Sequence, residues 1–219
     1  MTLTFPLSVG DFWERLKVAP SAPFTLTDTA ISSRTDDGQS FQSTRGVPLW
    51  TGPVVLAARP NRDARAMQSR IEMMARTGET FLAYDVTAQA PRSDPFGDRL
   101  GAASPTVGAI NGSDAFAVAI GGLPQGYAIS AGDMISIQTA SGRLNLVRAV
   151  DDVAVASVAG LTPLFRIEPG RFAEVAVGNA VTLVRPLAKF KVEPGSFDPG
   201  RQDGVNTSGA GFTMMQVIA

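Results

Sequence analysis

The sequence contains no cysteine and no histidine. Without cysteine the chain has no disulfide, no thiolate metal site and no cysteine nucleophile. Without histidine it lacks the serine–histidine–aspartate triad, histidine-bound zinc and the usual general base near neutral pH. These two absences remove half of the common catalytic side chains, so they favour a binding or structural role over an enzyme.

Charged residues are also scarce. They make up 18% of the 219 residues, against roughly 25% in a typical soluble domain. The net charge of −1 includes no basic block, so we expect no nucleic-acid specificity. No apolar run approaches the roughly 20 residues that span a bilayer, so we expect no membrane insertion. Few charges together with 22 glycines and 15 prolines indicate an all-β protein that buries surface against partners.

Residues 62–77 predict an amphipathic helix. The dipeptide Pro60-Asn61 is an N-cap signal, and Gly78 stands where a helix-ending glycine is expected. A shorter helix is predicted at residues 8–16, with Ser8 as its N-cap. The apolar stripe of the longer helix consists of Ala64, Met67, Ile71, Met74 and Ala75. Its other face carries Arg62, Arg65, Gln68, Arg70, Glu72 and Arg76. We interpret that face as solvated rather than as an anion or nucleic-acid contact.

The N-terminal strands are predicted from alternation and turn signals. Residues 24–31 and 49–56 predict two strands, and Thr35–Gly38 between them is typical of a hairpin turn. Because Pro53 removes a ladder N–H, the second strand is expected at a sheet edge or with a bulge. A further strand, residues 81–85, directly follows the long helix.

The second half of the chain predicts short strands only. Residues 88–108 are rich in proline, glycine, serine and aspartate and predict a loop or domain boundary. Strands are predicted beyond it at 115–120, 134–139, 144–150, 164–168, 180–184 and 187–192. Their spacing of roughly ten residues predicts a small barrel or sandwich. The tail closes with a strand at 212–218, which we expect to return to the N-terminal sheet.

Candidate chemistry is sparse. The adjacent carboxylates Asp36-Asp37 and Asp151-Asp152 lack a third oxygen ligand at calcium-loop spacing, so hydrogen bonding within turns is the favoured interpretation. The glycine runs at 108–112 and 208–212 match no phosphate loop. The serines lie in no nucleophile motif. We therefore expect no catalytic residue, no cofactor-binding residue and no metal ligand.

The aromatic residues allow two interpretations. Trp13, Trp50, Tyr84 and Tyr127 are candidates for a sugar-binding platform, but they are scattered, and core or interface positions are favoured. The candidate structural or interface residues are Trp50, Ile71, Met74, Phe81 and Tyr84.

Several runs together resemble a known family. Leu49-Trp-Thr-Gly-Pro-Val-Val-Leu56, the helix of residues 62–77 and Phe81-Leu-Ala-Tyr-Asp85 resemble the N-terminal region of the distal tail proteins of long-tailed phages. Other runs are similar to tail proteins from phages and prophages of alphaproteobacteria. These runs are residues 122–137, Val181-Thr-Leu-Val-Arg-Pro186 and Val192-Glu-Pro-Gly-Ser-Phe197. The similarity covers most of the chain, and no catalytic motif is part of it.

This resemblance implies a fold and a role. The family forms a ring, expected to be a homohexamer, that joins the tail tube protein to the baseplate hub protein in the virion after assembly in the host cytoplasm. It implies a mostly β fold, with a split β-barrel or sandwich and one packed helix (about 62–77). Residues 1–97 and 185–219 would form this ring domain, and residues 98–184 an inserted small β-barrel. The family has no catalytic residues or cofactors to transfer.

Other functions remain open from the sequence alone. The chain could be another minor tail or hub protein, or a carbohydrate-binding module in which residues 98–184 form a lectin-like barrel. A histidine-free hydrolase that uses carboxylates is the least favoured alternative.

Overall fold

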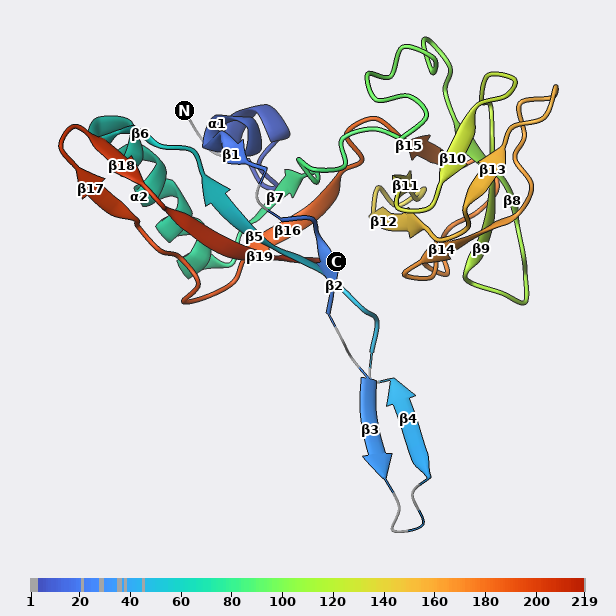
Figure 1. Ribbon diagram of the computed structural model, residues 1–219, viewed down its shortest axis with the longest axis horizontal. Coiled ribbons are helices and arrows are strands. Elements are labelled where there is room, and N and C mark those ends of the chain that lie inside the picture. Colours follow the sequence, from blue (N-terminus) through green and yellow to red (C-terminus); the bar gives the residue numbers. More distant parts are fainter. Residues whose placement is uncertain are drawn as a thin grey trace.

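The computed structural model describes residues 4–20, 22–27, 30–34, 37, 39–44 and 46–218. Strands make up 37% of the chain and helices 12%, which confirms the predicted mostly β fold. A curled half-barrel sheet with its helices lies beside a closed six-stranded barrel, and a narrow hairpin projects from the region between them (Figure 1).

The half-barrel is an antiparallel sheet that combines strands from both ends of the chain. Its order is β1 (Val18–Ala19), β5 (Trp50–Leu56), β19 (Gly211–Gln216), β16 (Ala188–Val192) and β7 (Thr80–Ala83), with β2 (Thr25–Leu26) also paired to β5. The C-terminal strand β19 lies between β5 and β16. This pairing confirms that the tail returns to the N-terminal sheet.

One face of this sheet carries the core. Strands β5, β16 and β19 bury every second residue, as expected when a single face packs inward. The ring centroid of Phe81 lies 4.8 Å from that of Phe12 and 6.1 Å from that of Trp13. It also lies 6.4 Å from those of Phe190 and Phe212. Phe81 is therefore the centre of an aromatic cluster.

Helix α2 (Asn61–Thr77) packs on this core through the predicted stripe. Ile71 and Met74 are completely buried, whereas Arg65 on the opposite face is exposed. Gly78 ends the helix in the left-handed region with a φ of 71°, and its N–H donates to Met74 O at 2.9 Å. The helix and the direction of its apolar face are both confirmed.

The start of α2 differs from the prediction. Asn61 does not cap the helix but is its first residue. Its side-chain nitrogen donates to Gly204 O at 2.9 Å, and its oxygen accepts from the Thr207 hydroxyl at 2.8 Å. Asn61 thus anchors a small sheet that the sequence did not reveal. That sheet contains β6 (Arg59–Pro60), β17 (Arg201–Asp203) and β18 (Asn206–Ser208).

The short N-terminal helix is confirmed together with its cap. One π-helical turn, η1 (Val9–Trp13), continues into α1 (Glu14–Leu16). The Ser8 hydroxyl accepts the N–H of Asp11 at 3.1 Å. Phe12, Trp13 and Leu16 are buried in the core of the half-barrel, so this segment closes the core.

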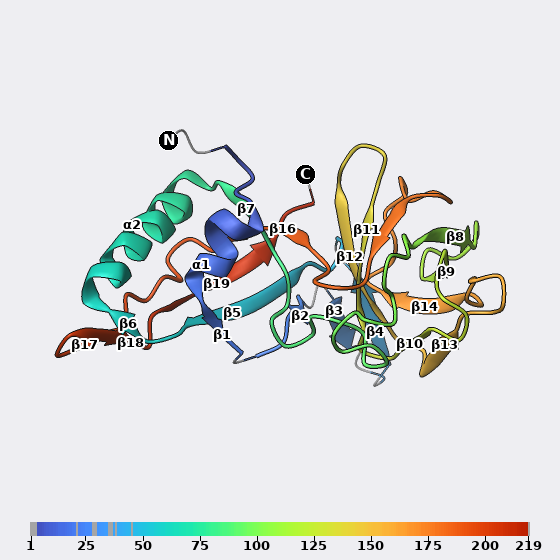
Figure 2. The same ribbon diagram turned by 90° about the horizontal axis from the view of Figure 1, so that it is seen from above.

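The barrel lies at the opposite end of the molecule from α2 (Figure 2). Its cyclic order is β11 (Met134–Gln138), β12 (Leu144–Ala149), β14 (Phe165–Glu168), β9 (Ala117–Gly121), β8 (Thr106–Ile110) and β15 (Ala180–Thr182). Branched apolar side chains fill its interior, among them Val107, Ile120, Ile135 and Val147, all fully buried. A separate pair, β10 (Ala128–Ser130) and β13 (Val153–Val155), lies beside the barrel strands.

Two details of the grouping of strands by spacing are wrong. The strand at 187–192, which the spacing groups with the barrel strands and the resemblance places in the ring domain, is β16 of the half-barrel sheet. The barrel is completed instead by β8, which lies at the end of the segment 88–108 that was predicted as loop or boundary. The other five predicted strands of this region are barrel strands.

The hairpin is formed by β3 (Ala30–Arg34) and β4 (Ser40–Thr44). The predicted strand 24–31 is therefore wrong in its extent, because its first part is β2 in the half-barrel sheet and its last part is β3 in the hairpin. The hairpin returns through β4, which was not predicted, rather than through residues 49–56. The predicted turn at Thr35–Gly38 falls between β3 and β4, and Thr35, Asp36 and Gly38 are outside the described residues.

Pro53 does not place its strand at an edge, because β5 is paired on both sides. Leu56 N–H donates to Ala210 O on the β19 side, and Ala57 N–H donates to Lys17 O on the other side. Main-chain N–H groups alternate between the two sides of a strand, so the main-chain nitrogen of Pro53 faces β1 and β2. These two short strands pair with opposite ends of β5 and leave Pro53 in the gap between them, where its missing N–H breaks no pair.

Candidate interaction surfaces

The five residues predicted as structural or interface positions all lie in the core of the half-barrel. Trp50, Ile71, Met74 and Phe81 are fully buried, and Tyr84 is 7% exposed. The structure brings them together as packing residues and leaves them almost no surface for a partner.

The four aromatic residues do not form the sugar platform that was the disfavoured alternative. Trp13 and Tyr84 meet edge to face at 6.4 Å between centroids, and both are buried. Trp50 belongs to the same core, whereas Tyr127 is buried in the barrel. None of the four rings presents a face on which a sugar could stack.

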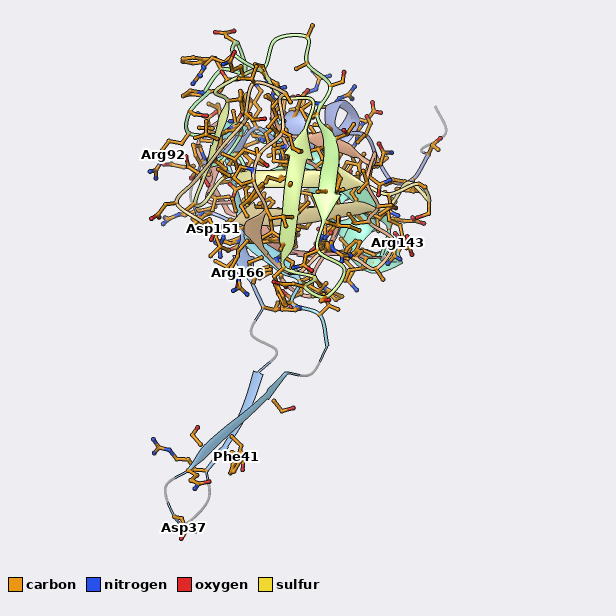
Figure 3. All side chains as sticks on the ribbon, turned by 90° about the vertical axis from the view of Figure 1, so that its right-hand side faces the viewer. Asp37, Phe41, Arg92, Arg143, Asp151 and Arg166 are labelled. Atoms are coloured by element: carbon orange, nitrogen blue, oxygen red, sulfur yellow. The ribbon has the colours of Figure 1, made fainter. Side chains whose placement is uncertain are left out.

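Asp37, Asp151 and Asp152 lie in a turn or a bend, but the Asp151 carboxylate binds a distant strand rather than its own turn. Asp151 accepts the N–H of Arg166 at 2.8 Å beside the barrel. Asp37 is exposed in the hairpin loop, at the other end of the molecule (Figure 3), and Asp36 is outside the described residues. Across the described ranges, no three acidic side chains are grouped so that they could hold a metal ion.

Sequence reasoning missed the buried carboxylate of Asp94. It accepts the N–H groups of Arg99 at 3.1 Å and Leu100 at 2.9 Å, and the Tyr127 hydroxyl at 3.3 Å. Burial alone would raise the pKa of Asp94, but these donors outweigh it and hold the pKa below its ordinary value. The pKa of Tyr127 is raised by burial and by the neighbouring Asp94 carboxylate.

Asp133 is a second buried carboxylate of this kind. It accepts the N–H groups of Ser130 at 2.8 Å and Arg92 at 2.9 Å. Burial raises its pKa above the ordinary value despite these bonds. Asp94 lies in the loop that follows Pro91 and is held by Tyr127 of the barrel core, and Asp133 binds the N–H of Arg92 in the same loop. These two bonds fasten the loop to the barrel. Their shifted pKa values have this structural cause.

The barrel is joined to the half-barrel by directed hydrogen bonds. The Ser136 hydroxyl on β11 donates to Leu187 O at 2.6 Å, next to the start of β16. Arg143 Nε donates to Ile218 O at 2.7 Å, next to the end of β19. Beside Arg143 a groove opens along this junction.

This groove has a volume of about 650 Å³. It is lined by residues 46–48 at the base of the hairpin, by residues 168–173, and by Phe116, Arg143 and Ile218. Its exposed apolar surface includes Val47 at 53% and Phe116 at 47% exposure. No single stretch of sequence signals the groove, because it is assembled from five separate segments.

Most charges of the groove are already paired. Arg143 binds Glu174 at 2.6 Å, and Arg148 binds Glu168 at 2.9 Å. The Ser141 hydroxyl and Arg143 hold the pKa of Glu174 below its ordinary value.

Arg171 differs from these pairs. It donates to Asn111 O at 2.8 Å, but its buried Nε has no partner, and no described carboxylate forms an ion pair with it. It is thus a charged residue of the groove lining that has no carboxylate partner among the described residues.

The hairpin is the second exposed feature. It projects away from both bodies, with Phe41 on its side and Asp37 near its end (Figure 3). The Phe41 side chain is 57% exposed and contacts no other aromatic ring of the described chain. Two-stranded hairpins are marginally stable in water by themselves.

The chain matches no protein-family model and no curated protein. None of the helices in the described ranges combines the length and the apolar character needed to cross a membrane.

Proposed function

We propose that this chain is a structural component of a phage tail tip, in which several copies, expected to be six, close into a ring between the tail tube and the baseplate hub. The proposal rests on the sequence resemblance to distal tail proteins and on a single structural observation. That observation is the β3–β4 hairpin, which leaves the half-barrel and has no packing partner in the described chain.

A two-stranded hairpin is only marginally stable by itself. Two paired strands with an exposed Phe41 gain little from their own contacts, and a neighbouring molecule would supply the missing contact area. In a closed ring every copy gives and receives this contact, so no hairpin is left uncovered. In this proposal residues 1–97 and 185–219 form the ring, and residues 98–184 carry the barrel on its outside.

The test is the molar mass in solution, followed by electron microscopy of assembled tails. The chain has a mass of 22.9 kDa, and the proposed ring has about six times that mass. Replacing residues 30–44 with a short Gly/Ser linker should give a folded monomer, whereas Phe96→Ala, at an exposed site on a different loop, should leave the ring intact. A natural chain that stays monomeric at high concentration, together with tails that contain no ring of it, would refute the proposal.

A further inference from the structure

The tip of the hairpin has a specific chemical character. Residues 35–41 contain two aspartates and no basic residue, and Phe41 is their only large apolar side chain. Asp37 is exposed and forms no ion pair with another described residue. Arg34 comes directly before this segment, lies opposite Ser40 and is exposed. The tip therefore presents one aromatic ring, an exposed carboxylate near its end and a guanidinium on the facing strand.

The groove at the junction has the complementary character. Val47, Phe116 and Phe172 offer apolar surface, and Arg171 offers a cation without a carboxylate partner among the described residues. An aromatic side chain that enters such a groove gains apolar burial, and a carboxylate beside Arg171 gains a charge-assisted hydrogen bond.

The hairpin cannot fill the groove of its own chain. The groove begins at Gly46, and Phe41 lies five residues earlier on β4, the strand that leads from the far end of the hairpin back to the groove. At about 3.3 Å per residue, this separation is roughly 16 Å along the strand. Figure 3 shows the same relationship, with Phe41 well removed from Arg143 on the barrel side.

From these observations we infer that the groove receives the hairpin tip of a second copy of this chain, with Phe41 against its apolar wall and Asp37 beside Arg171. This inference rests on the proposed ring and adds the receiving surface. The two surfaces differ, so the contact is head-to-tail and repeats around the assembly until the ring closes. The junction between barrel and half-barrel then has a role in assembly as well as in folding.

The absence of natural cysteine allows a direct test. Ser43 lies two residues from Phe41 on the same face of β4, and Ala173 is an exposed residue of the groove. Copies carrying Ser43→Cys are mixed with mass-tagged copies carrying Ala173→Cys and treated with a short bismaleimide. Each copy has one thiol, so a product that joins a tagged to an untagged chain links two molecules. We expect this mixed product to dominate.

Two controls separate the proposed contact from random collision. Pairing Ser43→Cys with Val158→Cys, which is 82% exposed on a different loop, should give almost no product. Adding Phe41→Ala to the Ser43→Cys chain should lower the yield at least about tenfold, because it removes the aromatic anchor. Adding Phe96→Ala instead should leave the yield unchanged.

The possible results test the groove contact and the proposed ring separately. Equal yields with Ala173→Cys and Val158→Cys, or a yield insensitive to Phe41→Ala, overturn the groove assignment. If a ring forms without the 43–173 product, the hairpin binds elsewhere and the groove is left for a different ligand, while the proposed function stands. A monomer that gives no product overturns both.

Discussion

The indole N–H of Trp50 donates to the main-chain oxygen of Leu146 at 2.8 Å, which links the half-barrel to the barrel. Both residues are fully buried, and the guanidinium of Arg148 lies 5.4 Å from the centre of the Trp50 ring. Trp13 is also buried, yet its indole N–H has no partner in the described chain. The two tryptophans therefore differ in their polar contact rather than in their burial.

This difference predicts unequal effects of the same substitution. Trp50→Phe removes a donor and leaves a buried carbonyl of Leu146 unpaired, which costs about 1–3 kcal/mol beyond the loss of packing. Trp13→Phe removes a donor that has no partner, so it should cost only the packing. The free energies of unfolding in urea measure both. Equal losses would mean that the hydrogen bond does not stabilise the junction.

Helix α2 provides a second prediction. Ile71 is fully buried in the core, so Ile71→Ala should lower the free energy of unfolding by roughly 2–5 kcal/mol through lost burial and a cavity. Arg65→Ala and Arg76→Ala on the exposed face should each cost less than about 1 kcal/mol. The unfolding midpoints of the three variants measure these losses of stability. Arginine variants as damaging as Ile71→Ala would contradict the orientation of the helix.

The sequence predicts α2 and most strands correctly because their signals are local. The stripe that ends at Ala75 and the glycine at 78 are sufficient to predict the helix and its end. Five barrel strands follow from short apolar runs between turn residues. These elements depend on side chains within a few residues of each other, so a single sequence contains the information.

Strand β8 escapes prediction because its glycine has an unusual function. In the sequence Gly108 indicates a turn. In the structure it lies inside a strand, at a register shift between Val107 and Ala109. A Cβ at this position would collide with the side chain of Leu161 and approach the main chain of Gly121. The glycine is needed for close packing, which depends on residues distant in sequence.

The hairpin and the groove could not be predicted from the sequence either, because both depend on the tertiary arrangement. Alternation continues from β2 into β3, and nothing local shows that the chain leaves one sheet for another. The groove combines Phe116, Arg171 and Ile218, which are far apart in the chain. The role of such residues follows only from the tertiary arrangement.

A third prediction concerns two glycines with positive φ. Gly178 has a φ of 89°, and a Cβ there would meet only open space, so Gly178→Ala should cost about 1–2 kcal/mol from backbone strain alone. Gly160 has a φ of 71°, and a Cβ there would also clash with Leu123 O. Gly160→Ala should therefore cost at least about 1 kcal/mol more. Thermal unfolding of both variants tests this order, and equal losses would contradict the close approach to Leu123.

The final prediction concerns acid stability. The pKa of Asp94 is lowered in the fold, so its contribution is complete above the unfolded value near 3.9 and is lost as the pH falls through the folded pKa. Asp94→Asn should accordingly lose most stability relative to the natural chain near neutral pH, and the difference should shrink in acid. Urea midpoints measured between about pH 3 and 7 give this difference directly.

Asp133 provides the matched control because its pKa is raised by burial. A raised carboxyl pKa means that the folded chain binds the proton more tightly, so the natural chain gains stability relative to Asp133→Asn as the pH falls through the folded pKa toward the unfolded value. The two variants should therefore show opposite slopes against pH. Parallel slopes would mean that the hydrogen bonds from Arg99 and Leu100 do not control the charge of Asp94, because burial alone shifts both carboxyls in the same direction.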